Sequence, residues 1–365
     1  MSQVDFALIG HLETWNAAAA VISALRGPQR PPISLADIRE IIPWIPPRAV
    51  CRVTVGSAKG HQVRGVYIDS FIPPDRLEGQ FLRENLTRVR KAAECAVRED
   101  ARIATLGGFS SILLEGKTNL LPRHPGTKFT TGNTLAVALI VRGIERALML
   151  ARRELCESNV LIIGASGDVG SGCARCLAPR VRLLLLCARN PGRLQGFASE
   201  FSWLGSRVQA DTDLLRLAEK ADVVICAASM AAPTLLLESL PLGAIICDAG
   251  YPKNLPPAFT PPEGAIFFGG LGQASAGLEL DPDLLGILNP HPFPAVAHGC
   301  LLEGMALALE ERFEPFSEGR GLITPQRVEE IWEIALKHGI ILAPLFNSDG
   351  PVEARISALA QELDR

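Results

Sequence analysis

The chain has 365 residues, of which 48% are hydrophobic, and its formal net charge at pH 7 is −3. A chain of this size buries a sizeable core and is expected to form two or three domains. Its slightly acidic balance argues against a general nucleic-acid binder, and no apolar run reaches the roughly 18 residues of a membrane helix. Nine cysteines without a disulfide framework predict free thiols in a reducing compartment, and hence a soluble cytoplasmic protein.

Short apolar runs in the first part of the chain predict strands at residues 4–10, 50–55, 62–69 and 101–106, the middle two forming a hairpin. Helical patterns cover residues 12–25 and 81–98, and Ser34 is a candidate cap of a short helix between them. A long helix is expected to follow the stretch 130–134 and to run to about residue 153. We therefore predict an N-terminal α/β domain over residues 1–132.

Residues 133–288 show a different pattern, in which predicted strands alternate with predicted helices. Strands are expected at residues 159–163, 183–188, 222–227, 243–248 and 265–268, with helices at residues 169–177, 191–200 and 214–220. Strands that alternate with helices indicate βαβ units, and therefore a central Rossmann-type domain with a parallel sheet. Residues 289–365 begin with a proline-rich break and continue as two amphipathic helices, at residues 298–312 and 325–338. They are predicted to form a C-terminal helical segment.

Three glycines follow the predicted strand 159–163 in a G-x-x-G-x-x-G pattern. Such a turn lets the backbone approach a pyrophosphate, and the following helix presents free N–H groups to it. An ordinary glycine-rich turn between a strand and a helix is the alternative. Contacts to a dinucleotide are expected from this turn and from the ends of the following strands, at Gly164, Ser166, Gly167, Asp168, Val169, Gly170, Arg189, Asn190, Ala228, Ser229 and Met230.

The second strand of this region ends at Arg189. In a site for NAD this position usually carries a carboxylate that binds the ribose hydroxyl. An arginine there suits the 2′-phosphate of NADPH, because a guanidinium binds phosphate oxygens in a planar fork. The sequence therefore predicts NADPH as the cofactor.

Several other stretches resemble those of the long-chain acyl-[acyl-carrier-protein] reductases. The matching stretches occur in the same order as in that family, across about residues 6–340. The resemblance implies NADPH-dependent reduction of a fatty acyl thioester to an aldehyde, through an acyl-cysteine intermediate. The acyl donor it implies is acyl-carrier protein, with acyl-CoA as a second possibility. The matching stretches are Leu8-Ile-Gly-His-Leu12, Leu106-Gly-Gly-Phe109, Phe129-Thr-Thr-Gly-Asn-Thr134, the glycine turn, Ala188-Arg-Asn190, Ala228-Ser-Met230, Gly250-Tyr-Pro-Lys-Asn-Leu255, and Cys300 with Glu303.

Reduction of a thioester needs a nucleophile that accepts the acyl group and later leaves as a thiolate, and cysteine does both. Cys300 opens a predicted helix just after Gly299, and a helix N-terminus is expected to lower the pKa of its thiol. From the residues alone, Cys300 is also compatible with a small core residue; the resemblance favours the nucleophile. Cys173 and Cys176 share a helix face and are expected to pack in the core. No histidine and cysteine stand at a ligand spacing, so no metal is predicted.

Candidates for substrate or auxiliary contacts are Gly108, Phe109, Thr131, Asn133, Tyr251, Lys253, His298 and Glu303. Tyr251 is a candidate donor to an oxyanion, and Lys253 is a candidate to orient a thioester carbonyl or a phosphate. Thr131 and Asn133 also suit the cap of the long helix, which is the simpler interpretation. His298 is close to Cys300 in the chain, but residues two apart on a helix do not face each other.

An acidic carrier protein would dock on a basic surface. Two helix sides are candidates, Arg88 with Arg90 and Lys91, and Arg142 with Arg146, Arg152 and Arg153, although solvated helix faces explain both patterns. Two other functions fit the same motifs. One is a shikimate-dehydrogenase-like hydride transfer on a small alcohol, without a covalent intermediate. The other is a non-catalytic sensor that binds NADP(H).

Overall fold

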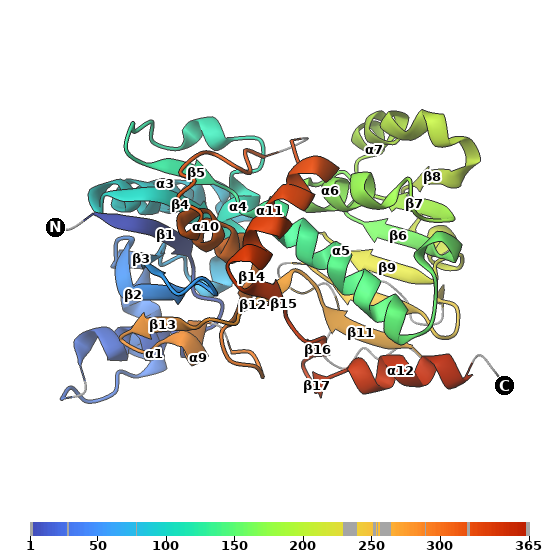
Figure 1. The fold of residues 1–365 in the computed structure, drawn as a ribbon. Coiled ribbons are helices and arrows are strands. Elements are labelled where there is room, and N and C mark those ends of the chain that lie inside the picture. Colours follow the sequence, from blue (N-terminus) through green and yellow to red (C-terminus); the bar gives the residue numbers. More distant parts are fainter. Residues whose placement is uncertain are drawn as a thin grey trace. The chain divides into compact units, whose positions relative to one another are not determined.

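The computed structural model describes residues 3–362 except residues 28, 78, 229–238, 251–252, 254, 256–263, 289 and 320–321. The chain forms two compact units (Figure 1). Unit 1 comprises Met1–Leu135, Gly272–Gly319 and Glu330–Ile341, and unit 2 comprises Ala136–Leu271, Arg320–Glu329 and Leu342–Arg365. Each unit is therefore assembled from segments that are far apart in the sequence.

The predicted boundary after residue 132 falls close to the end of the first segment, at Leu135. The structure differs for residues 289–365, which were expected as a separate helical segment and are instead divided between the two units. The physical reason is helix α10 (Gly299–Leu309), whose residues are all buried. A helix that is buried on every side belongs to the core of a larger body, here the core of unit 1.

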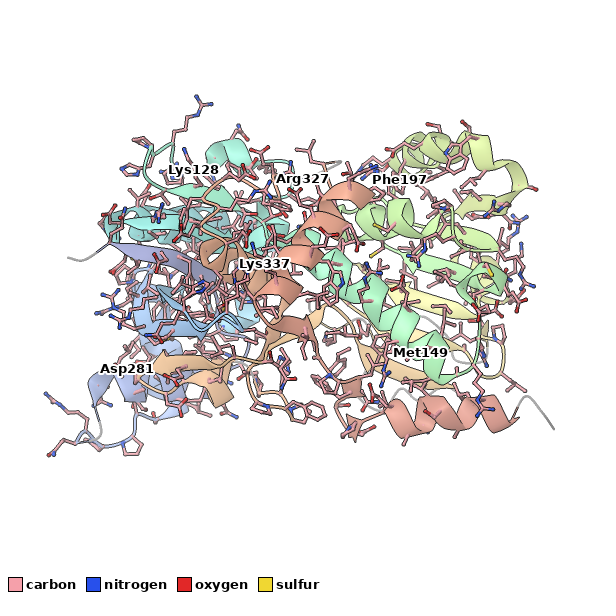
Figure 2. The ribbon with its side chains drawn as sticks, viewed as in Figure 1. Lys128, Met149, Phe197, Asp281, Arg327 and Lys337 are labelled. Carbon is pink, nitrogen blue, oxygen red and sulfur yellow. The ribbon has the colours of Figure 1, made fainter. Side chains whose placement is uncertain are left out.

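Unit 1 contains a six-stranded mixed sheet of order β13-β2-β3-β1-β4-β5. The strands β3, β1, β4 and β5 run parallel, whereas β2 pairs antiparallel with both β3 and β13. β5 lies at one edge of the sheet and carries Lys128, which Figure 2 labels. The bounds of the strands are β1 (Val4–Gly10), β2 (Arg48–Gly56), β3 (Gln62–Asp69), β4 (Ala101–Leu106), β5 (Lys128–Thr130) and β13 (Leu278–Asp281).

Local capping explains where the first helices of unit 1 begin. The Thr14 hydroxyl accepts a hydrogen bond from the Ala17 N–H, so the first helix starts three residues later than its apolar pattern predicts. The Ser34 hydroxyl accepts one from the Asp37 N–H, as its predicted role as a cap requires. Besides α10, unit 1 contains the helices α1 (Trp15–Arg26), α2 (Leu35–Ile41), α3 (Leu82–Arg98), α4 (Phe109–Leu113) and α9 (Leu285–Leu288).

Unit 2 contains a six-stranded sheet of order β11-β10-β9-β6-β7-β8, in which every pair is parallel. Numbered within the unit, this is the doubly wound order 3-2-1-4-5-6 of Rossmann folds. The predicted α/β class with a parallel sheet is therefore confirmed. The bounds are β6 (Asn159–Ile163), β7 (Leu183–Cys187), β8 (Val208–Asp211), β9 (Val223–Cys226), β10 (Ile245–Asp248) and β11 (Ala265–Phe268).

The remaining elements complete the two units. Met149, labelled in Figure 2, lies near the end of the long helix α5 (Asn133–Leu150) and is 58% exposed. None of the helices in the described residues has both the length and the apolar character that a membrane span requires. The other helices are α6 (Asp168–Leu177), α7 (Pro191–Ala198), α8 (Leu214–Ala218), α11 (Pro325–Lys337) and α12 (Glu353–Glu362), and the short strands are β12 (Leu271–Ala274), β14 (Val296–His298), β15 (Ile340–Leu342), β16 (Phe346–Asn347) and β17 (Gly350–Pro351).

Candidate active site

The turn after β6 requires glycine for two reasons: the backbone conformation there is left-handed, and neighbouring backbone atoms leave no room for a side chain. Gly164 has φ of 84°, a left-handed conformation that side chains disfavour. A Cβ at this position would also lie 2.7 Å from the carbonyl oxygen of Ala227 and 2.9 Å from the Cα of Ala228. The end of β6 therefore touches the end of β9. These two strands form the switch point of the sheet, where doubly wound folds bind their ligands.

The two following glycines keep the start of α6 close to this turn. A Cβ on Gly170 would overlap the carbonyl group of Gly164, and one on Gly167 would lie 3.2 Å from the same oxygen. Gly167 is the N-cap of α6 and no side chain caps the helix. Backbone N–H groups at the start of a helix bind anions, and such a helix start without a side-chain cap leaves them available. The turn, which includes Ser166, Asp168 and Val169, thus has the features that a dinucleotide phosphate requires.

Basic residues follow the end of β7. Arg189 is exposed and makes no hydrogen bond or ion pair with another described residue. Asn190 accepts a hydrogen bond from the Arg193 N–H at 2.9 Å and so caps α7. The Arg193 guanidinium donates to the carbonyl oxygen of Ser166 at 2.9 Å. Arg193 was not predicted as a cofactor contact. Its position in the first turn of the helix that follows Arg189 could have indicated one.

The other predicted contacts of unit 2 lie at the ends of β9 and β10. Ala228 packs beside Gly164, as described above, whereas Ser229, Met230 and Tyr251 lie outside the described residues. The Lys253 ammonium donates to the carbonyl oxygen of Asp248 at 3.1 Å and lies over the ring of Phe268, 4.6 Å from its centroid. These contacts hold Lys253 at the carboxyl end of the sheet.

Cys300 lies in unit 1, in the first turn of α10, and its backbone is closely surrounded. The Thr105 hydroxyl of β4 donates to the carbonyl oxygen of Cys300 at 2.7 Å. A Cβ on Gly132 would lie only 2.5 Å from the Cα of Cys300, so the stretch 130–134 can pass here only because it contains glycine. The N–H groups of Gly108 and Leu301 form hydrogen bonds to the Cys300 thiol.

The pKa of the Cys300 thiol differs from the sequence-based expectation. Hydrogen bonds from the backbone N–H groups of Gly108 and Leu301 lower it, as a helix start was expected to do. Burial has the larger effect, however, and raises the pKa above its ordinary value because a thiolate loses its hydration there. The negative charge of Glu303 raises it further. In this structure the resting group is therefore a thiol.

Glu303 follows Cys300 by one helical turn and is fully buried. Its carboxylate accepts hydrogen bonds from the Thr130 hydroxyl at 2.5 Å, the Ser317 hydroxyl at 2.9 Å and the Leu135 N–H at 3.0 Å. Burial raises the pKa of Glu303, and these donors oppose the shift. Because Thr130 begins the stretch 130–134 and Leu135 follows it, Glu303 joins the Cys300 helix to that stretch and holds it in place.

Two buried polar residues of unit 1 were not predicted as site residues. His11 is buried with its ring 6.0 Å from the ring of Phe109, and burial lowers its pKa to about 4. Tyr67 reaches Gly10, where a Cβ would overlap its hydroxyl, and burial and the nearby Asp69 raise its pKa. The charge of Cys300 also contributes to this shift. The stretch Leu8–Leu12 of the family resemblance was the only signal for His11.

The remaining candidates of unit 1 have structural contacts. Thr131 is 1% exposed and its N–H donates to the carbonyl oxygen of Ser317. Asn133 is the first residue of α5, whose next two N–H groups bind Ser317 and Glu303 instead of a local cap. His298 precedes α10 and packs its ring 5.6 Å from that of His291.

The two basic helix sides proposed for docking are largely engaged within the protein. Arg88 is half-buried and donates to the carbonyl oxygens of Ile45 and Phe71 at 3.1 and 2.9 Å, and also to that of Pro43. Of the second group, Arg142 pairs with Glu145 and Glu329, Arg146 pairs with Glu353, and Arg153 donates to the carbonyl oxygen of Gly243. These arginines stabilise the fold, which leaves Arg90, Lys91 and Arg152 as their exposed members.

No family model matches the chain. Curated proteins that are similar to it in sequence include the following two. It is 29% identical over 343 residues to the long-chain acyl-[acyl-carrier-protein] reductase of Synechococcus elongatus, a match that covers 92% of this chain and 97% of the relative. It is 27% identical over 267 residues to the aminotransferase PigE of a Serratia species, covering 71% of this chain but only 30% of that protein.

The similarity to solved structures is weaker. The L-tryptophan dehydrogenase of Nostoc punctiforme is 14% identical with a TM-score of 0.36, covering 98% of this chain and 87% of that one. The quinate dehydrogenase of Corynebacterium glutamicum is 17% identical with a TM-score of 0.33, covering 68% and 80% of the two chains. Because these TM-scores are below 0.5, the strand order of unit 2 is the evidence for its fold.

Proposed function

We infer from the similarity over nearly its whole length that the chain belongs to the family of long-chain acyl-[acyl-carrier-protein] reductases. We propose that it is an oxidoreductase that reduces a fatty acyl thioester to the aldehyde with NADPH. The relationship to the Synechococcus protein carries this proposal. Because that match leaves only 8% of the chain uncovered, it spans both the Gly164 turn and Cys300.

The covalent step is assigned to Cys300. Its sulfur attacks the carbonyl carbon of the thioester, the carrier thiol departs with the proton, and the acyl group remains on Cys300 as a new thioester. The N–H groups of Gly108 and Leu301 support this assignment, because donors to the sulfur stabilise the thiolate that attacks and later leaves. Glu303 is a positioning residue, since its hydrogen bonds orient the helix that carries Cys300.

The turn from Gly164 to Gly170, with Arg189 and Arg193, is assigned to the cofactor. The glycines leave room for a pyrophosphate, and the two arginines suit a 2′-phosphate. When bound, the nicotinamide supplies the hydride that converts the acyl-cysteine into a thiohemiacetal. The anion of this thiohemiacetal then collapses, which breaks the carbon–sulfur bond, releases the aldehyde and expels Cys300 as a thiolate. A proton from solvent restores the thiol.

The proposal is tested by mass spectrometry of the intact protein after incubation with a fatty acyl thioester and no NADPH. We expect one added acyl group that is labile to hydroxylamine, absent in Cys300→Ser, and present in Cys156→Ser, which removes an exposed cysteine as a control. Cys300→Ser should also lose aldehyde formation while still binding NADPH. An adduct on another cysteine, or aldehyde formation by Cys300→Ser at the wild-type rate, would exclude this mechanism and favour hydride transfer without a covalent intermediate.

The cofactor assignment has its own test. Arg189→Ala is expected to raise the KM for NADPH by roughly tenfold or more and to change that for NADH little, because a charge-assisted hydrogen bond contributes about 1.5–3 kcal/mol. Steady-state kinetics with both cofactors gives the comparison. Equal effects on NADPH and NADH would mean that Arg189 does not bind the 2′-phosphate.

A further inference from the structure

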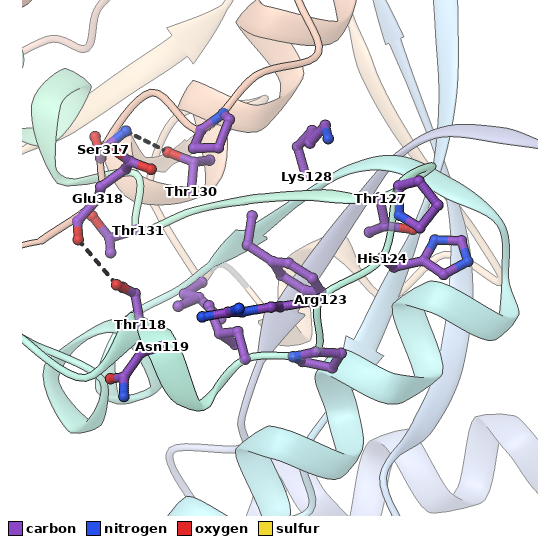
Figure 3. A pocket seen from close by; sticks show the side chains of 16 residues that line it. Thr118, Asn119, Arg123, His124, Thr127, Lys128, Thr130, Thr131, Ser317 and Glu318 are labelled. Carbon is purple, nitrogen blue, oxygen red and sulfur yellow. Dashed lines mark hydrogen bonds between the residues drawn. The ribbon is translucent and has the colours of Figure 1, made fainter.

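Unit 1 contains an open cavity of about 550 Å³ between the edge strand β5 and the loop that precedes it (Figure 3). Apolar side chains, among them Leu106, Leu121 and Phe129, form part of its wall. Residues from a third segment, Ser317 and Glu318, close another side. The cavity therefore combines an apolar wall with polar and charged groups, as ligand sites do.

Three basic side chains line the cavity, Arg123, His124 and Lys128. Within the described part of the chain, none of them takes part in a hydrogen bond or an ion pair. By contrast, Arg88, Arg142 and Arg153 bind carboxylates or carbonyl oxygens of the protein itself. Glu318 is the single carboxylate at the cavity, so the two permanent cations leave a positive excess there. An anionic ligand suits this charge.

Two buried hydroxyls at the cavity also lack a partner. Thr127 and Thr131 are 2% and 1% exposed, and neither hydroxyl oxygen makes a hydrogen bond in the described structure. Leaving such a group unsatisfied in the interior is unfavourable, so buried hydroxyls are normally hydrogen-bonded. Thr130, which lies between them, has two partners, Glu303 and the Ser317 N–H. The two orphaned hydroxyls therefore indicate that a polar ligand completes the cavity.

The cavity borders the segments that hold Cys300. Leu106 precedes the glycine pair whose second member donates to the Cys300 thiol, and Thr131 precedes Gly132, which packs on the Cys300 backbone. In Figure 3 the Arg123 side chain extends between the β5 strand and the segment that carries Thr118. A ligand in this cavity is thus held by the same loops that position the nucleophile.

We propose that this cavity receives the phosphate-bearing pantetheine arm of the acyl donor. The inference rests on the proposed function, because that arm is the part of an acyl-carrier protein or of CoA that ends in the thioester. The phosphate matches Arg123 and Lys128, the amides match the orphaned threonine hydroxyls, and the dimethyl group matches the apolar wall. Acyl-carrier protein and CoA share this chemistry, and the donors used below distinguish them.

Equilibrium binding of 4′-phosphopantetheine and of pantetheine tests the site without any catalytic step. Wild type is expected to bind the phosphate-bearing compound at least about tenfold more tightly, because charge-assisted hydrogen bonds from Arg123 and Lys128 to the phosphate are absent with pantetheine. The double variant Arg123→Gln/Lys128→Gln should abolish this difference. Glu318→Gln should instead strengthen binding of the phosphate compound a few-fold, a gain that a damaged fold does not produce.

Arg64→Gln/Arg83→Gln is the matched control, because it removes two exposed arginines of unit 1 that have no side-chain partner among the described residues. It should leave the binding of both compounds unchanged. The proposal is overturned if wild type binds the two compounds equally, or if the control weakens binding as much as the cavity variant does.

The acylation assay then separates this proposal from the function itself. Wild type and the cavity variant are incubated without NADPH with acyl-pantetheine, acyl-CoA or acyl-carrier protein, and adduct formation is followed by intact mass. Selective slowing of the two phosphate-bearing donors supports the site, and slowing of only one identifies the physiological source. If wild type binds 4′-phosphopantetheine but no donor acylates it, the proposed function fails while the site stands. If the variant slows all three donors equally, the site is wrong while the function stands.

Discussion

Cys300 shows how burial and hydrogen bonding compete at one residue. Backbone N–H groups stabilise its thiolate, but removal from water destabilises it more, and the pKa rises. We therefore predict that alkylation of Cys300 by iodoacetamide continues to accelerate above pH 9, because only the thiolate reacts and its fraction is still increasing there. The rate is measured by peptide mass spectrometry in Cys156→Ser, which lacks the exposed cysteine. A rate that levels off near neutral pH would mean that the backbone donors outweigh burial.

Adjacent threonines provide a second test at this scale. Thr130 donates to the buried Glu303 carboxylate and accepts from the Ser317 N–H, whereas the Thr131 hydroxyl has no partner. Thr130→Val should lower the free energy of unfolding by about 1.5–3 kcal/mol, because it removes a hydrogen bond to a charged group. Thr131→Val should be neutral or stabilising, since it removes an unsatisfied hydroxyl. Urea denaturation of both variants checks the contrast, and equal losses would contradict it.

At the scale of the element, two glycines of the β6 turn and α6 are expected to differ in their effects: substitution of Gly167 affects cofactor binding, and substitution of Gly170 also affects stability. A Cβ on Gly170 would overlap the Gly164 carbonyl, whereas one on Gly167 meets that oxygen at 3.2 Å, a tight contact that a small shift relieves. Gly167→Val is therefore expected to abolish NADPH binding with the fold retained, because its branches occupy the space of the pyrophosphate. Gly170→Ala should lower the melting temperature as well. Fluorescence titration and thermal unfolding give both readouts; unchanged NADPH affinity in Gly167→Val would place the cofactor elsewhere.

The elements that the sequence predicts well are those whose own residues carry a strong pattern. Strands such as β6 and β7 are continuous buried runs, and α3 has one strongly apolar face. β8 was missed because each of its residues is only half-buried, so no apolar run or alternation marks it. β5 was missed because three residues are too short to show a period.

The candidate site follows the same division. The glycine turn was predictable because strand, turn and helix are adjacent in the chain, and Cys300 was identified mainly through the family resemblance. The surroundings of Cys300 were not predictable, because they depend on strand pairing. β1 lies between β3 and β4 in parallel register, and this brings Tyr67 against Gly10 from a distant part of the sequence. Burial, which decides the thiol pKa, likewise appears only once α10 is packed.

At the scale of the whole molecule, unit 1 depends on a helix that lies far along the chain. The buried side chains of α10 include Leu301, Leu302, Met305, Leu307 and Leu309. At about 1.5–3 kcal/mol for each large apolar side chain, their burial contributes on the order of 10 kcal/mol, comparable to the whole stability of a domain.

A fragment of residues 1–132 is therefore predicted not to fold by itself, although its pattern resembles a complete α/β domain. Without α10 it exposes the apolar surface that the helix covers, and it should aggregate or lack a cooperative urea transition. Near-UV circular dichroism and urea titration of the fragment, with the full chain as reference, check this outcome. Two-state unfolding of the isolated fragment would show that α10 adds to a core that is already sufficient.

Because the two units are assembled from interleaved segments of the chain, they are also able to fold at different stages of translation. All six strands of the unit 2 sheet lie between residues 159 and 268, so that sheet can be completed while α10 is still being translated. Unit 1, although its first strand is synthesised first, must wait for β13 and α10. The half assigned to the cofactor is thus able to mature early. The nascent β1–β4 surface stays exposed for most of translation, which makes it the part of the newborn chain with the greatest need of chaperone protection.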